Sequence, residues 1–522
     1  MFKGLTLTSA SNVLKCGIGN RNYQNHTEDR IMEKKRLYTI LDSSKGIKRI
    51  VNKMESLLRL TIAGLTIVLL STSLYSADAE KGENTAPDKK SAEKGLSSSP
   101  DALEEYKKGE EEFREGDYER SIRRYTEAVE TDPEFAEAFY KRGIVNMELK
   151  NYSDAIKDFN KAKALKQEFA RAYSKRGRVY HLRGMVRDAL EDFNTAVSIN
   201  EGFAEPYNYM GQTNYANGNI DKALKDFNAA IQIDSEYADA YYQRGLLYGR
   251  TKKLDSALKD LNTAVKKKKE FKKAYKAKGI ILMKKEEYKQ AVAPLSSVLL
   301  IDPEDTDVYL NRGICYYKNR EYQKAVKDFS AVIDLDSEKP VAYFNRGSCY
   351  KETGRISKAI KDFETALGIK PKYTEAYISL GNTLLIKADY QKAVNSFKKA
   401  LNLDPGNIKA LVNTGIAYSS TERYKQALKY YRQAMERDPE NAEIHYNAGV
   451  VYFYMENYKK ALEEYNTALA IDPEKASVYL NRAETYLFLN RRDEARKDLK
   501  RVIDLKPETR LAEKSRRLLS SQ

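Results

Sequence analysis

Residues 306–339 read TDVYLNRGICYYKNREYQKAVKDFSAVIDLDSEK, and residues 340–373 read PVAYFNRGSCYKETGRISKAIKDFETALGIKPKY. The two stretches share a glycine at position eight, an alanine at position twenty and a phenylalanine at position twenty-four. The spacing continues in both directions without insertion, so that twelve units of 34 residues fill 102–509. A unit this short cannot bury its own apolar face, and neighbouring units must therefore stack into a solenoid.

Small residues recur at three positions of the unit. Position eight is Gly in eleven units and Ala483 in the last, position twenty is Ala in all units but the first, and position twenty-seven is Ala or Val. These residues let two antiparallel helices approach closely, while a large residue at position twenty-four, such as Phe159, fills the space beside them. Proline at position thirty-two in seven units cannot continue a helix. Each unit is therefore predicted to be a helix, a short polar turn and a second helix.

This pattern of Gly, Tyr, Ala, Phe, Ala and Pro resembles the tetratricopeptide repeat family, and the resemblance covers 408 of the 522 residues. It implies an all-α fold, an α-solenoid in which twelve antiparallel helix pairs form a right-handed superhelix. Position seven departs from the family, because it is usually apolar there and is often Arg here, as in Arg312 and Arg346. After the last unit, residues 510–522 are predicted to form a capping helix that covers the exposed core with its leucines.

The first hundred residues differ in kind. Residues 1–53 form a basic, unpatterned leader with 11 Lys and Arg against 4 Asp and Glu, and Met32 or Met54 is an alternative start. Residues 54–79 contain an uncharged run of 18 residues, 60–77, which is just long enough to span a bilayer and indicates a signal peptide or a single-pass signal anchor. A flexible linker, 80–101, then leads to the repeats.

The charges around the apolar run predict its orientation. Lysines and arginines precede the run, whereas mixed charges follow it. The positive-inside bias therefore places the N-terminus in the cytoplasm and the repeat array on the non-cytoplasmic side, exported or membrane-anchored through 60–77. The alternative is a buried apolar helix, which is less favoured because nothing nearby in the sequence could bury it.

The sequence carries no pattern typical of an enzyme. It has three histidines and contains no phosphate-binding loop, HExxH motif or nucleophile elbow. Cys315 and Cys349 occupy position ten of adjacent units, where a helix-pair spacing of about 10 Å is too long for a disulfide. We expect a non-enzymatic protein without cofactor, metal or small-molecule substrate, which acts by binding other proteins.

Helix periodicity predicts which surface of the array binds. At 100° per residue, positions four, seven, eight and eleven of the first helix face the interior, whereas positions two, five, six and nine face the opposite way. In the family that second face lines a concave groove. In the C-terminal half, position six carries five amides and one serine: Asn311, Asn345, Ser379, Asn413, Asn447 and Asn481. Position five carries an apolar row beside them: Leu310, Phe344, Ile378, Val412, Tyr446 and Leu480.

A row of amides can clamp the backbone of an extended peptide whatever its sequence, because an amide both donates and accepts hydrogen bonds. The apolar row would then take alternate side chains of the peptide. The five asparagines resemble the asparagine ladder of the O-linked N-acetylglucosamine transferases, interrupted here by Ser379. The alternative is that Asn at this position only follows the repeat consensus. No three consecutive units supply the Lys, Asn and Arg set of a chaperone-tail clamp, so that activity is not expected.

The predicted function is therefore a scaffold that binds extended segments of partner proteins and aids assembly of an envelope protein complex. A second candidate is an adaptor that docks acidic proteins or anionic membrane through a basic patch. Units five and six carry 16 Lys and Arg against 9 Asp and Glu, within a net charge of +16. The lysines of the patch are Lys266, Lys267, Lys268, Lys269, Lys272, Lys273, Lys276 and Lys278. A solvated inter-repeat turn is the alternative, and nucleic acid is not expected because no aromatic interleaving accompanies the lysines.

Overall fold

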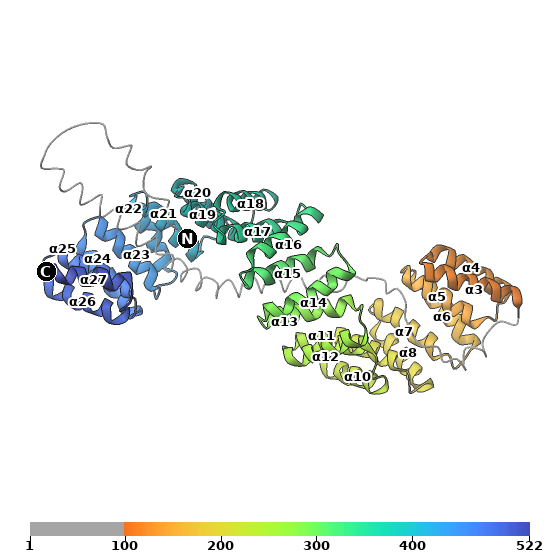
Figure 1. Cartoon of the computed structure of the whole chain (residues 1–522). Coiled ribbons are helices and arrows are strands. Elements are labelled where there is room, and N and C mark those ends of the chain that lie inside the picture. Colours follow the sequence, from red (N-terminus) through yellow and green to blue (C-terminus); the bar gives the residue numbers. More distant parts are fainter. Residues whose placement is uncertain (1–98, 522) are drawn as a thin grey trace. The chain divides into compact units, whose positions relative to one another are not determined.

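The computed structural model describes residues 99–521, and within them it contains 25 α-helices and no strand (Figure 1). The first helices of the twelve repeats are α3 (Pro100–Glu115), α5 (Ala136–Glu148), α7 (Ala170–Leu182), α9 (Ala204–Ala216), α11 (Ala238–Arg250), α13 (Lys272–Lys284), α15 (Thr306–Lys318), α17 (Pro340–Glu352), α19 (Thr374–Ile386), α21 (Ile408–Ser419), α23 (Ala442–Tyr454) and α25 (Ala476–Phe488). The second helices are α4 (Tyr118–Thr131), α6 (Tyr152–Leu165), α8 (Val186–Ile199), α10 (Ile220–Ile233), α12 (Leu254–Lys267), α14 (Tyr288–Ile301), α16 (Tyr322–Leu335), α18 (Ile356–Ile369), α20 (Tyr390–Leu403), α22 (Tyr424–Met435), α24 (Tyr458–Ile471) and α26 (Arg492–Leu505). A last helix, α27 (Arg510–Ser520), follows the twelfth repeat.

Each first helix packs against the second helix of its own repeat, and each second helix packs against the first helix of the next repeat. From α5 to α25, the first helices of successive repeats also contact one another, and α25 contacts α27. The leucines of α27, Leu511, Leu518 and Leu519, pack against the core of repeat twelve, which includes Leu480 and Leu499. The prediction of an all-α solenoid with twelve helix pairs and a C-terminal helix is therefore confirmed.

The contact between position eight and position twenty-four determines how closely the two helices of a repeat approach. A Cβ atom on Gly415 would lie 2.3 Å from Cε1 of Tyr431, whose side chain is almost fully buried. Such a separation is impossible for non-bonded carbon atoms, so the ring requires a glycine opposite it. Ala483 in repeat twelve faces the smaller, fully buried Leu499.

The turns between the two helices of each repeat follow one scheme. Position fifteen has a left-handed backbone in all twelve repeats, at Gly116 (φ 82°) and equally at Glu286 (φ 61°). The residue after it donates its amide to the carbonyl of position eleven, as Asp117 does to Glu112 (2.9 Å), which closes the end of the first helix. Glycine or asparagine fills this position in only five repeats, so the helix-end geometry is imposed on the other side chains as well.

The predicted leader 1–53, the apolar segment 54–79 and nearly all of the linker 80–101 lie outside the described residues, and these interpretations stay predictions. Of the helices in 99–521, none is both long enough and apolar enough to cross a membrane.

We predict that Gly415→Ala destabilises repeat ten by about 1–3 kcal/mol, because the added methyl group would overlap the ring of Tyr431. The measurement is urea-induced unfolding, combined with hydrogen exchange of peptides that cover α21 and α22. Gly368→Ala in α18 is the matched control, because nothing lies within 4 Å of its Cβ position. This control should be neutral or gain up to about 1 kcal/mol from helix propensity. Equal effects of the two substitutions would contradict the proposed contact.

Candidate functional site

The first helices of neighbouring repeats meet through side chains at positions two, five, six and nine. Asn413 at position six donates to Asn382 at position nine of the preceding repeat, with 2.7 Å between Nδ2 and Oδ1. Asn481 at position six donates to the hydroxyl of Tyr446 at position five of the preceding repeat (3.2 Å). The positions predicted from helix periodicity therefore form one surface along adjacent first helices, which we call the first-helix face.

The predicted peptide-binding residues all belong to the first-helix face, but they differ in accessibility. Asn311 is only 4% exposed and Leu480 only 1% exposed, and Phe344 and Ile378 are also buried. Phe344 packs on the ring of Phe363, with 5.8 Å between the ring centroids. The remaining predicted residues are partly exposed: Leu310, Asn345, Ser379, Val412, Asn413, Tyr446, Asn447 and Asn481. Half of the apolar row is thus buried in the core, while four of the five amides reach the surface.

Two of the accessible amides are held by the protein and two are not. Asn413 and Asn481 make the bonds described above, which fix the orientation of their side chains. Asn345 and Asn447 make no side-chain hydrogen bond to any other residue of 99–521. The partly exposed amides of Asn345 and Asn447 can therefore donate to and accept from a ligand.

The lysines on the first-helix face of the early repeats are paired across repeat boundaries. Lys141 lies 2.6 Å from Glu110 of the preceding repeat. Lys175 lies 2.6 Å from Glu205 of the next repeat, and the hydroxyl of Ser174 bonds the same carboxylate (3.1 Å). Ion pairs between repeats thus neutralise the positive charges of Lys141 and Lys175.

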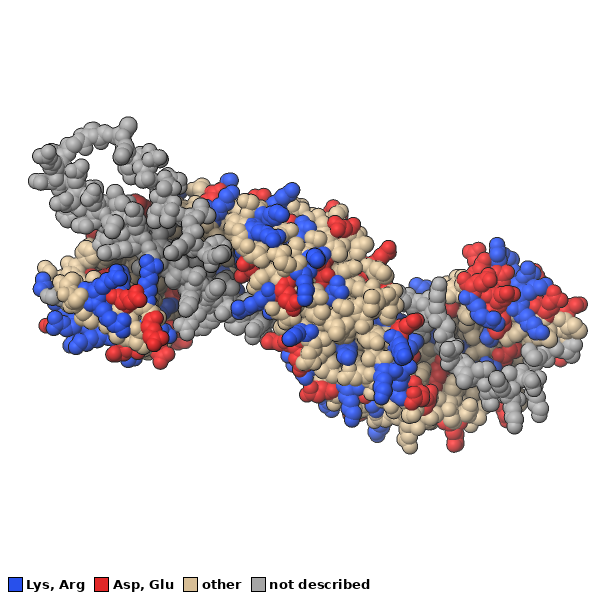
Figure 2. Space-filling model, viewed as in Figure 1, with Lys and Arg blue, Asp and Glu red and all other residues tan. Residues whose placement is uncertain are grey.

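Ion pairs also neutralise some of the lysines of the basic patch and leave others exposed. Lys267 pairs with Glu236 of the preceding repeat. Lys272 pairs with Asp302, and Lys276 lies 3.1 Å from Asp305. Burial lowers the pKa of the partly buried Lys278. Lys273 is also partly buried, and the exposed members are Lys266, Lys268 and Lys269. Acidic and basic side chains are interspersed on the face that Figure 2 shows. Docking of acidic partners or membrane at this patch stays a prediction, and it now depends chiefly on the three exposed lysines.

A repeated cluster around the arginine at position seven was not predicted from the sequence. In repeat seven, Nε and Nη2 of Arg312 donate to the two carboxylate oxygens of Asp328, each at 2.8 Å. Nη1 donates to the hydroxyl of Ser296 in the preceding repeat (2.9 Å), and the guanidinium lies 5.6 Å from the centre of the Tyr309 ring. The hydrogen bond to Asp328 raises the pKa of Arg312. We call this arrangement the arginine staple, because it joins both helices of one repeat to the repeat before it.

The staple occurs in six repeats, always between position seven and position twenty-three. The pairs are Arg142–Asp158, Arg176–Asp192, Arg244–Asp260, Arg312–Asp328, Arg346–Asp362 and Arg482–Asp498. The sequence contains a pattern that could have predicted it, since every arginine at position seven is followed sixteen residues later by an aspartate. Position seven is therefore basic here because of an ion pair within the array.

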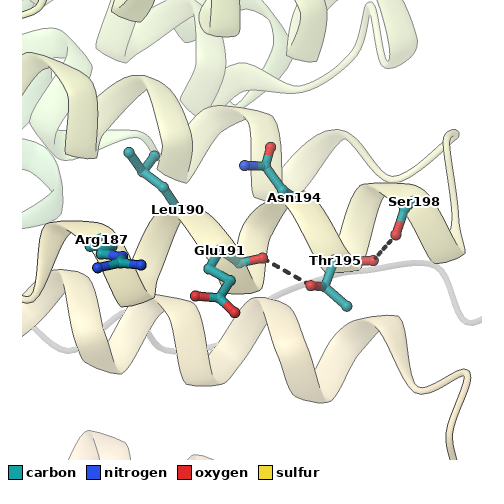
Figure 3. Close-up of a pocket in the computed structure, with 6 residues that line it drawn as sticks. All are labelled: Arg187, Leu190, Glu191, Asn194, Thr195 and Ser198. Carbon is teal, nitrogen blue, oxygen red and sulfur yellow. Dashed lines mark hydrogen bonds between the residues drawn. The ribbon is translucent and has the colours of Figure 1, made fainter.

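The described chain also contains a surface hollow and two buried cysteines. Figure 3 shows a hollow whose lining residues all belong to α8, and two of its hydroxyls bond the backbone of that helix: Thr195 to Glu191 (2.9 Å) and Ser198 to Thr195 (2.8 Å). Burial raises the pKa of both Cys315 and Cys349 to about 12, so these thiols are protonated at neutral pH. Among residues 99–521, no three metal-ligating side chains are grouped to hold an ion.

Comparison with models of known protein families agrees with the array of repeated helix pairs. Profiles described as tetratricopeptide repeat or TPR repeat match residues 106–168, 211–252, 238–271, 306–339, 340–373, 375–440, 412–476 and 452–518. The chain belongs to the tetratricopeptide repeat family. Its repeats and its fold support a protein–protein interaction scaffold. No curated protein sequence matches the chain significantly.

Solved structures of the same repeat type are similar to the chain at low identity. The APC/C hetero-tetramer Cut9-Hcn1 is 14% identical over 80% of this chain and 96% of that chain, with a TM-score of 0.38. Yeast Tom70 is 18% identical over 80% and 95%, with a TM-score of 0.35. A tetratricopeptide repeat protein from Parabacteroides merdae is 18% identical over 47% and 96%, with a TM-score of 0.40. Values this low carry no argument about function.

We predict that Arg312→Met destabilises the array by about 3–5 kcal/mol, because it leaves Asp328 buried without its partner. The double variant Arg312→Met with Asp328→Leu should recover most of that loss, since no unpaired buried charge remains. Chemical denaturation of the three proteins measures the coupling. Lys324→Met, which breaks an exposed pair with Glu321, should cost less than about 1 kcal/mol. If Arg312→Met lost no more stability than Lys324→Met, the structural role of the staple would be contradicted.

Proposed function

We propose that the first-helix face of repeats seven to twelve binds extended segments of partner proteins, and that the chain holds these segments during assembly of an envelope protein complex. Family membership supports a scaffold in general, and the side chains of this face support the choice of ligand. Extended segments expose backbone N–H and C=O groups, which need partners whatever the sequence of the segment. A row of side-chain amides supplies both kinds of partner.

The observation that carries the proposal is that the side chains of Asn345 and Asn447 are available for hydrogen bonds to a ligand. Both amides are partly exposed, and neither bonds another residue of 99–521. Asn413 and Asn481 lie on the same face, already oriented by bonds to neighbouring first helices. Partly exposed apolar side chains beside them, Leu310, Val412 and Tyr446, offer contacts for side chains of the bound segment.

The envelope location is proposed from the sequence. The uncharged run 60–77 follows a basic leader and precedes a linker of mixed charge, which is the order expected of an exported or anchored protein. An array held outside the cytoplasm would meet partner segments after their own export. The two parts of the proposal are independent, since the first-helix face would bind the same kind of segment in any compartment.

We predict that Asn345→Ala with Asn447→Ala weakens binding of extended partner segments on the order of tenfold, because each lost hydrogen bond contributes about 1 kcal/mol. Partners are first identified by crosslinking in cells and mass spectrometry, and their segments are then titrated as labelled peptides. Asn194→Ala with Asn262→Ala removes two exposed amides from second helices and should leave the dissociation constant unchanged. Unchanged binding by the Asn345 and Asn447 variant would refute the amide clamp.

We predict that residues 1–101, fused to a reporter enzyme that is active only after export, give an active reporter. Val68→Lys with Leu69→Lys should abolish that activity, because each lysine at the centre of an apolar segment costs about 3 kcal/mol on insertion. Ser97→Lys with Ser98→Lys adds the same charge in the linker and should have no effect. An inactive wild-type fusion would exclude export through 60–77 and leave the peptide-binding proposal untouched.

A further inference from the structure

Repeat ten departs from the rest of the array at the site of the arginine staple. Its position seven is Thr414, whose buried hydroxyl bonds the carbonyl of Ala410 in its own helix (2.6 Å). Position four, aromatic in every stapled repeat, is Leu411 here, and position twenty-three is Tyr430 in place of aspartate. The guanidinium, its carboxylate and one flanking ring are therefore all missing from a place that six other repeats fill.

A hollow of about 560 Å³ opens at this place, between the second helices α20 and α22. This volume is within the range of ligand-binding pockets. Apolar side chains and one ring line part of it: Leu401, Pro405, Leu411 and Tyr430. Polar and charged side chains line the remainder: Lys398, Asn402, Gln433, Glu436 and Arg437.

Tyr418 holds two members of the lining in place. Its ring is nearly buried and stacks on the ring of Tyr430, with 5.6 Å between centroids and 19° between planes. The ammonium of Lys398 lies 5.9 Å from the centre of the same Tyr418 ring. A hydrogen bond to Tyr418 raises the pKa of Lys398, which is therefore charged at neutral pH.

Arg437 supplies the second cation, from a position that is Leu or Ile in nine other repeats. Helix α22 ends at Met435, two residues earlier than most second helices, so Arg437 lies in the following turn. Its Nη1 approaches Gly406, 3.8 Å from where a Cβ atom would be. The charge of the lining is thus two cations against the one carboxylate of Glu436, with apolar surface between them.

We propose that this hollow is a second protein-docking site, distinct from the first-helix face, and that it takes a partner segment with a carboxylate side chain next to an aliphatic or aromatic one. The cations Lys398 and Arg437 pair with the carboxylate, and the apolar surface around Leu411 and Tyr430 receives the neighbouring side chain. The stapled repeats cannot bind such a segment there, because their own guanidinium occupies the place. The site therefore belongs to repeats nine and ten, and it does not depend on the amide row.

The test uses the full chain and a fluorescein-labelled peptide in which Asp alternates with Leu and Phe, titrated by fluorescence anisotropy. Lys398→Glu with Arg437→Glu should weaken binding by about tenfold or more, as expected for loss of charged hydrogen bonds. Lys425→Glu with Lys429→Glu changes the net charge equally on exposed positions of α22 and should shift binding less than about twofold. A peptide with Lys in place of Asp should not bind.

A second variant rebuilds the staple in repeat ten: Thr414→Arg, Tyr430→Asp and Lys398→Asn, which copies Arg482, Asp498 and Asn466 of repeats twelve and eleven. This variant should melt cooperatively, show unchanged helical circular dichroism, and no longer bind the acidic peptide. The variant Asn345→Ala with Asn447→Ala should still bind the acidic peptide. The proposal is overturned if wild type does not bind the peptide, if the rebuilt variant still binds it, or if the amide variant or the Lys425 and Lys429 control loses it.

Discussion

The close contact between position eight of the first helix and the large side chain at position twenty-four determines the geometry of every repeat. At Gly415 even a methyl group would overlap the buried ring of Tyr431, so the two helices pack at a distance that only a glycine or, beside Leu499, an alanine allows. The same contact recurs every 34 residues without insertion. Consecutive repeats therefore present the same surfaces to their neighbours, and the first helices meet along one face.

Neighbouring repeats are joined in two different ways. Where position seven is arginine, a staple such as Arg346–Asp362 crosses the boundary and bonds Ser330 of the preceding repeat. Repeats nine to eleven have Leu380, Thr414 and Ala448 at that position, and the largest apolar core cluster runs from repeat eight to repeat eleven. Apolar burial replaces the ion pair there, because a small or apolar residue at position seven leaves room for continuous packing. The unfilled hollow of repeat ten is a local result of that exchange.

The candidate site could be predicted in part. Helix periodicity predicted that positions two, five, six and nine share one face, and hydrogen bonds join positions five, six and nine of adjacent repeats. It could not tell that Asn311 and Leu480 are buried while Asn345 and Asn447 stay accessible, since burial depends on the side chains of the adjacent repeats. Nor could it separate the paired lysines of the basic patch from the exposed Lys266, Lys268 and Lys269. The acidic partners of the paired lysines lie about 30 residues away in the chain, as Glu236 does from Lys267.

The sequence by itself determined the repeat length, the number of helix pairs and the residues that pack within each repeat, because a strict 34-residue period of small and large side chains permits one arrangement. Only the tertiary structure decided which charges are neutralised and which polar side chains remain available. Ion pairs such as Lys175–Glu205 and the staples join residues of different helices, and their geometry exists only after the repeats stack. The hollow of repeat ten also depends on that stacking, because it is formed by side chains of two repeats around a missing third group.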